Sequence, residues 1–281
     1  MILEGADVRL NYEVIGEGTP VTLLHGFTQS GRSWHEVISK MPSGWRWVVP
    51  DLRGHGDTRV QPDALHTMEA CTEDLEMLWD HLGIARCHLV GYSMGGRLAL
   101  HIAATRPARA LSLLTIGAHA GLKEDERENR RRDDQALAQR IENDGLEAFV
   151  DYWSSLPLFA GLERRGPSYV GQVRAERLNN RAAGLAESLR GMGAGAMRPV
   201  WDELARVRCP CTFVAGQLDD GYVVSARRLA ASVPNGRVVI VQRAGHSVHQ
   251  ERPDAFARLL IAHLEAATDR PEASPSSSTS A

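Results

Sequence analysis

The sequence lacks the features of membrane-spanning, disulfide-rich and metal-binding proteins. No apolar run approaches the roughly 18 residues that a membrane helix needs. The first residues contain no basic region followed by an apolar stretch, so we expect no signal peptide, no membrane contact and a cytoplasmic location. The four cysteines have the spacing of neither a disulfide framework nor a zinc site; they are Cys71, Cys87, Cys209 and Cys211. We therefore expect reduced thiols and no bound metal.

The chain also lacks a strong charge of either sign. Its formal net charge is −3 over 281 residues, which gives no general attraction to nucleic acid or to anionic lipid. Hydrophobic residues make up 43% and charged residues 24%, as in ordinary soluble domains. We expect no nucleic-acid partner, so any recognition of charge must be local. Nothing in the sequence indicates an oligomeric state.

What the chain does contain is an alternation of short apolar strands and helices. Strand-like runs occupy residues 8–14, 21–24, 45–50, 87–91, 110–116, 212–215 and 238–241. Helical patterns occupy residues 68–82, 95–105, 223–232 and 253–267. This alternation predicts an α/β fold with a mostly parallel, doubly wound sheet that is covered on both faces. The first strands, joined by Gly16-Glu-Gly18, predict an antiparallel start to the sheet.

The alternation stops between residues 119 and 199, which are helical in pattern and rich in arginine and acidic residues. We interpret this stretch as a helical cap inserted into a core formed by residues 1–118 and 200–267. A cap would lie over the carboxyl ends of the strands, where open α/β sheets bind their ligands. The alternative is a set of ordinary packing helices with solvated charged faces. Residues 268–281, rich in serine and proline, predict a disordered tail.

Residues 91–95 read Gly-Tyr-Ser-Met-Gly, which fits the pattern G-x-S-x-G. The pattern follows an apolar strand and opens a helix, and this setting is typical of the nucleophile elbow of the α/β-hydrolase fold. Small residues two places before and after the serine allow a tight turn that presents the hydroxyl above the sheet. We therefore predict that Ser93 is a catalytic nucleophile.

A serine hydroxyl becomes reactive only when a neighbouring group accepts its proton, and histidine suits that role near neutral pH. In this fold the chain order is serine, acid, histidine. Asp219 and His246 follow the last two expected strands in that order, so we predict the triad Ser93, Asp219, His246. Asp220 is the alternative acid. His249 completes an H-x-x-H pattern with His246, but without a third ligand this is weak evidence of a metal site.

The loop after the strand at residues 21–24 reads His-Gly-Phe. In this fold one backbone N–H of the oxyanion hole comes from this loop, and the other comes from the residue after the nucleophile. We therefore predict an oxyanion hole formed by the amides of Phe27 and Met94. His25, and His55 in a later Gly-His-Gly turn, are interpreted as turn-forming residues.

Beyond the fold, the chain resembles the 2-succinyl-6-hydroxy-2,4-cyclohexadiene-1-carboxylate (SHCHC) synthase family of menaquinone biosynthesis, over about residues 20–260. The resembling stretches are 24–34, 50–56, 91–97, 149–153, 156–159, Arg177 with 179–180, 184–190, Trp201, and 244–246 with His249 and Glu251. The first stretches are general to the fold. Three features are more specific to the family: Arg97 beside the elbow, the cap tryptophan Trp153 and the Arg177-x-Asn-Asn stretch.

The resemblance implies a lyase that expels pyruvate from an anionic small molecule, 2-succinyl-5-enolpyruvyl-6-hydroxy-3-cyclohexene-1-carboxylate, without metal or organic cofactor. The triad would remove a proton alpha to the succinyl carbonyl. This substrate carries three carboxylates, which guanidinium groups match with paired donors. The resemblance implies such roles for Arg97, Arg131 and Arg177; Arg130 could exchange places with Arg131, because residues 130–132 are all arginine.

Tyr92 and Trp153 are further candidates, as residues that line the apolar part of the pocket. Core packing is the alternative for both side chains. Two other functions compete with the lyase. A carboxylesterase or carbon–carbon bond hydrolase would use the same triad but would not need several convergent arginines. A non-catalytic small-ligand receptor of this fold would not need an intact triad.

Overall fold

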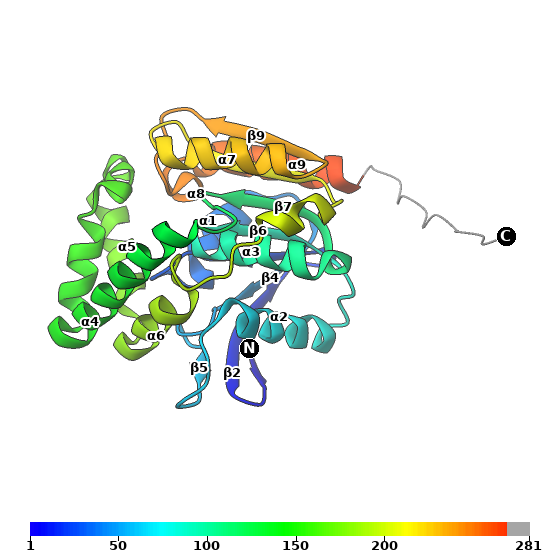
Figure 1. The fold of residues 1–281 in the computed structure, drawn as a ribbon. Helices are drawn as coiled ribbons and strands as arrows, with labels where there is room; N and C mark the ends of the chain where they lie inside the picture. Colours follow the sequence, from blue (N-terminus) through cyan, green and yellow to red (C-terminus); the bar gives the residue numbers. More distant parts are fainter. Residues whose placement is uncertain (269–281) are drawn as a thin grey trace.

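The computed structural model describes residues 1–268, so the tail expected at 268–281 lies outside the described residues except for Thr268. These residues form a nine-stranded sheet with the order β1-β2-β4-β3-β6-β7-β8-β9, and β5 pairs with β2 (Figure 1). The strands are β1 (Ile2–Glu4), β2 (Val8–Ile15), β3 (Gly18–Leu24), β4 (Gly44–Pro50), β5 (Arg59–Val60), β6 (Cys87–Tyr92), β7 (Ala110–Ile116), β8 (Cys211–Gly216) and β9 (Gly236–Val241).

Along the sheet order β4-β3-β6-β7-β8-β9, each strand is parallel to its neighbour. The pairs that β2 makes with β1, β4 and β5 are antiparallel. The mostly parallel sheet with an antiparallel start is therefore confirmed. One detail differs from expectation. The turn at residues 16–18 does not join neighbouring strands, because β4 lies between β2 and β3.

Helices cover both faces of the sheet, and each face has its own hydrophobic core. Residues of α2 (Met68–His81), α3 (Met94–Thr105) and α7 (Asp220–Ser232) pack in one core, with Leu75, Leu98 and Leu229 among them. The other core contains residues of α1 (His35–Ile38), α8 (Val248–Glu251) and α9 (Pro253–Thr268), with Phe256 fully buried.

Three further helices lie together beside the sheet (green in Figure 1), and we call them the cap helices. They are α4 (Glu124–Ser154), α5 (Pro167–Leu178) and α6 (Ala182–Met192), and the 3₁₀ helix Pro157–Arg165 joins α4 to α5. The helix α4 is interrupted at Gly145, whose φ of 83° is not helical. None of the described residues between 119 and 199 forms a strand.

The cap helices are attached to the core by close backbone contacts and by a buried amide. A Cβ on Gly54 would lie 2.3 Å from the carbonyl oxygen of Gly184 in α6, so only glycine allows this approach. The side chain of Asn180 donates to the carbonyl oxygen of Thr28 at 2.8 Å and accepts from the amide of Gly56 at 2.9 Å. These bonds fix the cap helices against the loops that follow β3 and β4. None of the helices in residues 1–268 has the length and apolar character to cross a membrane.

Candidate active site

Ser93 lies on the turn between β6 and α3 in a backbone conformation that non-glycine residues rarely adopt, with φ 51° and ψ −108°. A Cβ on Gly91 would lie 2.2 Å from the carbonyl oxygen of Gly95, and one on Gly95 would lie 2.2 Å from that of Leu24. The turn is therefore tight enough to require both glycines. The amide of Ser93 donates to the carbonyl oxygen of Ile116 at 2.8 Å and helps to hold the turn against β7.

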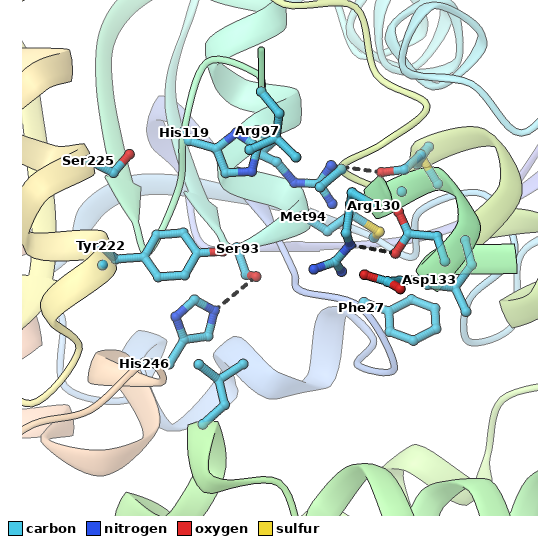
Figure 2. A pocket seen from close by; sticks show the side chains of 18 of the residues that line it. Phe27, Ser93, Met94, Arg97, His119, Arg130, Asp133, Tyr222, Ser225 and His246 are labelled. Atoms are coloured by element: carbon cyan, nitrogen blue, oxygen red, sulfur yellow. Dashed lines mark hydrogen bonds and ion pairs between the residues drawn. The ribbon is translucent and has the colours of Figure 1, made fainter. Parts of the chain in front are cut away.

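The three side chains that we expected to form a triad lie in contact. The hydroxyl of Ser93 lies 3.0 Å from Nε2 of His246 (Figure 2), and Nδ1 of His246 lies 2.7 Å from a carboxylate oxygen of Asp219. A proton on Nδ1 donated to Asp219 leaves Nε2 free to accept the serine proton. Asp220, the alternative acid, is exposed at the start of α7 and makes no contact with the imidazole.

The imidazole of His246 is held in place by aromatic rings and by backbone. The ring of Tyr222 lies 4.6 Å from it and that of Tyr92 lies 5.3 Å from it, centroid to centroid. Gly117, with φ 57°, lies directly against the ring, because a Cβ there would come within 2.6 Å of Cε1 of His246. Any other residue at position 117 would push the imidazole away from Ser93.

Two backbone amides next to Ser93 have no partner. The N–H groups of Phe27 and Met94 form no hydrogen bond with any residue of the described chain. The loop of Phe27 is fixed by Gln29, which accepts from the amide of Gly26 at 3.0 Å and donates to Gln250 at 2.8 Å. Free amides on a fixed loop and at a helix start are the usual donors to an oxyanion.

The loop that carries His246 is fixed by a buried carboxylate, Glu251, which the family resemblance includes but to which the sequence assigned no role. Glu251 accepts from the amides of Gly245 at 2.8 Å and Ser247 at 3.1 Å. His249 is fully buried, and its ring lies against those of Trp34 at 4.6 Å and Tyr92 at 4.5 Å. Burial, with a smaller effect of His246, lowers the pKa of His249 to about 3, so this ring is a neutral packing group.

The other two histidines singled out from the sequence are buried and bonded to backbone. Nδ1 of His25 donates to the carbonyl oxygen of Gly26 at 2.8 Å, and its Nε2 accepts from the amide of Leu52 at 2.9 Å. Nδ1 of His55 lies 3.0 Å from the carbonyl oxygen of Arg53. In residues 1–268, no three His, Cys, Asp or Glu side chains are grouped so that they could hold a metal ion.

A cavity of about 660 Å³ opens in front of Ser93, between the core and the cap helices. The size is that of a site for a small organic molecule. One part of its wall is apolar and includes Trp153, Leu156 and Phe159 of the cap region. Another part is polar and contains Arg97 and Arg130, which lie near each other in Figure 2.

Arg97 is a largely buried cation that has no carboxylate partner within the described chain. It lies one turn into α3, and its guanidinium donates to the carbonyl oxygen of Met192 at 2.9 Å and to the sulfur of Met197 at 3.4 Å. Burial lowers the pKa of Arg97 to about 10. Burying a cation without a counterion is costly, so its remaining donors suit an anionic ligand.

Of the two arginines that the sequence left as alternatives, Arg130 and not Arg131 lines the cavity. Arg130 lines the cavity, and its Nε donates to the buried carboxylate of Asp134 at 2.8 Å. Arg131 lies outside the cavity wall, where its half-exposed side chain pairs with Glu128 at 3.1 Å. One residue along a helix turns a side chain by about 100°, which separates the two positions.

Arg177 also lies outside the cavity wall, although it is buried. Its guanidinium stacks on the ring of Phe159, with 4.5 Å from Cζ to the ring centroid, and donates to the hydroxyl of Ser154 at 2.6 Å. Phe159 itself lines the cavity, so Arg177 lies behind the wall. Its buried Nε has no partner in residues 1–268. Tyr92 and Trp153, the two aromatic candidates, do line the cavity.

His119 and Tyr222 are among the cavity residues that sequence reasoning missed. His119 follows β7 and Tyr222 lies in the first turn of α7, and their rings are stacked with centroids 6.4 Å apart. Both follow carboxyl ends of central strands, which is the one sequence signal that could have identified them.

Comparisons with known proteins find similar sequences. The family model described as alpha/beta hydrolase fold matches residues 19–253. A Bacillus subtilis protein named putative 2-succinyl-6-hydroxy-2,4-cyclohexadiene-1-carboxylate synthase is 35% identical, over 91% of this chain and 95% of its own length. The Enterobacter protein named as that synthase is 30% identical, over 85% of this chain and 89% of its own.

Solved structures are similar as well. The structure of MenH from S. aureus has a TM-score of 0.87 and 29% identity, covering 92% of this chain and 99% of that one. An esterase from Thermogutta terrifontis, solved with malate bound, has a TM-score of 0.78 and 28% identity, covering 92% and 94%.

Proposed function

Because the chain belongs to the SHCHC synthase family within the α/β-hydrolase fold, we propose that it eliminates pyruvate from 2-succinyl-5-enolpyruvyl-6-hydroxy-3-cyclohexene-1-carboxylate. The chain is then a carbon–oxygen lyase of menaquinone biosynthesis that acts on a small anionic molecule. A cytoplasmic location is part of the same proposal. The observation that carries it is the guanidinium of Arg97, which has no carboxylate partner in residues 1–268 and lies in the cavity that also contains Ser93.

The reaction begins with removal of the ring proton alpha to the succinyl carbonyl. The hydroxyl of Ser93, 3.0 Å from Nε2 of His246, relays this proton to the imidazole. Asp219, bonded to Nδ1 at 2.7 Å, holds the ring in the required orientation and stabilises its positive charge. The triad therefore serves as a base and forms no covalent intermediate in this reaction.

The electron pair from the broken C–H bond moves first onto the succinyl carbonyl oxygen. The free amides of Phe27 and Met94 stabilise this enolate because they are directed at charge that forms only during the reaction. As the enolate collapses, the ring double bond shifts and the ether C–O bond breaks, so pyruvate leaves as its enolate and takes up a proton. All electrons stay within the substrate and product, so the step needs no oxidant or reductant.

Charge recognition accounts for the polar wall of the cavity. Arg97 offers donors to one substrate carboxylate, and Arg130, shared with Asp134, is the second cavity arginine that we assign to substrate binding. Trp153 and Tyr92 line the cavity where the ring of the substrate would pack. Arg177 supports this wall through its stacking on Phe159.

The test is release of pyruvate by the purified chain without added metal or nucleotide, read by coupling to lactate dehydrogenase. We expect release well above the uncatalysed rate, and loss of it in Ser93→Ala. A rate no higher than that of the uncatalysed reaction would reject the lyase.

A carboxylesterase is the second candidate, favoured by the same triad, the same free amides and the likeness to the Thermogutta terrifontis esterase. An esterase would use Ser93 as a nucleophile and would form an acyl-enzyme. Rapid hydrolysis of p-nitrophenyl esters without pyruvate release would favour this function. The cavity arginines argue for the lyase, since a neutral ester gives them no partner.

A further inference from the structure

His119 lies at the polar end of the cavity, beside Arg97 (Figure 2), and no role has been assigned to it so far. It follows the carboxyl end of β7, on the short segment that leads to the first cap helix. Its ring is stacked on that of Tyr222, with an interplanar angle of 27°. The ring is therefore held in one orientation at the cavity wall.

The protonation of this imidazole follows from its hydrogen bonds. Nδ1 accepts from the amide of Gly121 at 3.0 Å, so Nδ1 carries no proton. The neutral ring then carries its proton on Nε2, which has no bonding partner in residues 1–268. Burial, with the charges of Arg97 and Arg130 nearby, lowers the pKa of His119 to about 3. At neutral pH the side chain is thus an uncharged donor that lines the cavity.

We infer that His119 and Arg97 together bind one carboxylate of the substrate, with the Nε2–H of His119 on one oxygen and the guanidinium on the other. This inference deepens the proposed function and takes the identity of the anion from it. One nitrogen of Arg97 is already occupied by Met192 and Met197, so a second donor beside it completes the recognition of a planar carboxylate. A neutral donor avoids adding a third positive charge next to Arg97 and Arg130.

The groups around His119 exclude an acid–base role. Burial has the largest effect on its pKa, followed by the two arginine cations and the amide of Gly121, and Tyr222 packs on its face. No carboxylate pairs with its ring in residues 1–268, so protonation has no stabilising partner. His119 is therefore a substrate-binding residue that acts on affinity, and proton transfer stays with the triad.

The experiment compares His119→Leu, which removes the donor, with His119→Gln, which keeps an uncharged N–H donor. His101→Leu is the matched control, because His101 is a buried histidine of α3 outside the cavity wall. Three quantities are measured: kcat and KM for pyruvate release, the Kd of 2-(3-carboxypropanoyl)benzoate by calorimetry, and hydrolysis of p-nitrophenyl acetate. The benzoate is a stable aromatic compound with the ring and succinyl carboxylates of the substrate.

We expect His119→Leu to raise KM about tenfold to a hundredfold, the range for a lost hydrogen bond to a charged group. Acetate ester hydrolysis should change less than about twofold, and His119→Gln should recover part of the loss. A parallel rise in the Kd of the benzoate would assign the ring or succinyl carboxylate to this pair; a rise in KM alone would assign the enolpyruvyl carboxylate.

Unchanged KM and Kd in His119→Leu, or equal losses on the neutral ester, would overturn the inference. So would a changed pH profile of kcat in His119→Gln, because a donor that stays neutral should leave the profile intact. The two proposals fail separately. If the unmodified chain releases no pyruvate, the proposed function fails. A benzoate Kd that His119→Leu raises would then still support the carboxylate site, and an unchanged Kd would reject it for the ring and succinyl carboxylates.

Discussion

Replacing Arg97 by methionine separates substrate binding from stability, because the two effects should have opposite signs. Arg97→Met keeps an unbranched side chain of similar length and removes the charge. A hydrogen bond to a charged group contributes about 1.5–3 kcal/mol. At about 1.4 kcal/mol for each factor of ten, kcat/KM for pyruvate release should fall about tenfold to a hundredfold, and more if two bonds to the carboxylate are lost.

Stability should move the other way. Burial lowers the pKa of Arg97 from its ordinary value to about 10, so the folded protein disfavours the charged form. With about 1.4 kcal/mol for each unit, this cost is on the order of 3 kcal/mol. For a base whose folded pKa is lowered, the cost is fully present at every pH below about 10 and declines as pH rises from there toward the ordinary arginine pKa. Losing the bond to Met192 offsets about 1 kcal/mol.

The free energy of unfolding of Arg97→Met at pH 7 should therefore equal or exceed that of the unmodified chain. Calorimetry measures it, and the coupled dehydrogenase assay measures kcat/KM. Arg106→Met is the control, because Arg106 caps the other end of α3 and forms an exposed pair with Glu76. Hydrolysis of p-nitrophenyl acetate should hardly change in Arg97→Met, and Arg97→Lys should recover only part of kcat/KM, since an ammonium lacks the planar fork.

One result would refute this reasoning. If Arg97→Met lowers the melting temperature and leaves kcat/KM unchanged, the guanidinium is structural and serves to stabilise the fold through its hydrogen bond to Met192. Equal losses on the anionic substrate and on the neutral ester would lead to the same conclusion.

Three further predictions follow from the site. Asp219→Asn should lower kcat by about two to four orders of magnitude, whereas Asp220→Asn should stay within about twofold; the reverse outcome in steady-state assays would reject the assigned acid. Arg130→Gln should raise KM about tenfold while Arg131→Gln leaves it nearly unchanged, and equal KM values would remove Arg130 from the binding site. Gly117→Ala should lower kcat at least tenfold and the melting temperature by a few degrees, because the new Cβ displaces the catalytic imidazole and strains a left-handed backbone; unaltered kcat would contradict this account of the imidazole's support.

The order and type of the main elements could be predicted because each is encoded locally. Continuous apolar runs and glycine-bounded turns mark the strands. The strand expected at residues 110–116 has the same bounds as β7, and the bounds of the other expected strands agree to within a few residues. The pairing of β2 is different. Whether a strand pairs with its sequence neighbour depends on a third strand, β4, that enters between them, and no local pattern encodes that insertion.

The triad positions could be predicted for a related reason. Ser93, Asp219 and His246 each follow a strand, and parallel strands bring their carboxyl ends to one edge of the sheet. Strand ends therefore fix which residues can meet. His119 follows a strand in the same way, but histidine after a strand is common in turns, as His25 and His55 illustrate. Only its position beside Arg97, which depends on tertiary packing, distinguishes it.

The cap arginines mark the limit of this kind of reasoning. The sheet sets the position of a side chain at a strand end. On a long charged helix, the direction of a side chain depends on how the helix is rotated about its own axis. Three consecutive arginines leave that rotation undetermined, because apolar residues are too few in this part of α4 to mark its buried face. The rotation is fixed instead by Asp134, a buried carboxylate that accepts from Arg130 at 2.8 Å and from the amide of Gly195 at 3.2 Å. A polar anchor thus decides which arginine faces the cavity, and a search for apolar periodicity could not have found it.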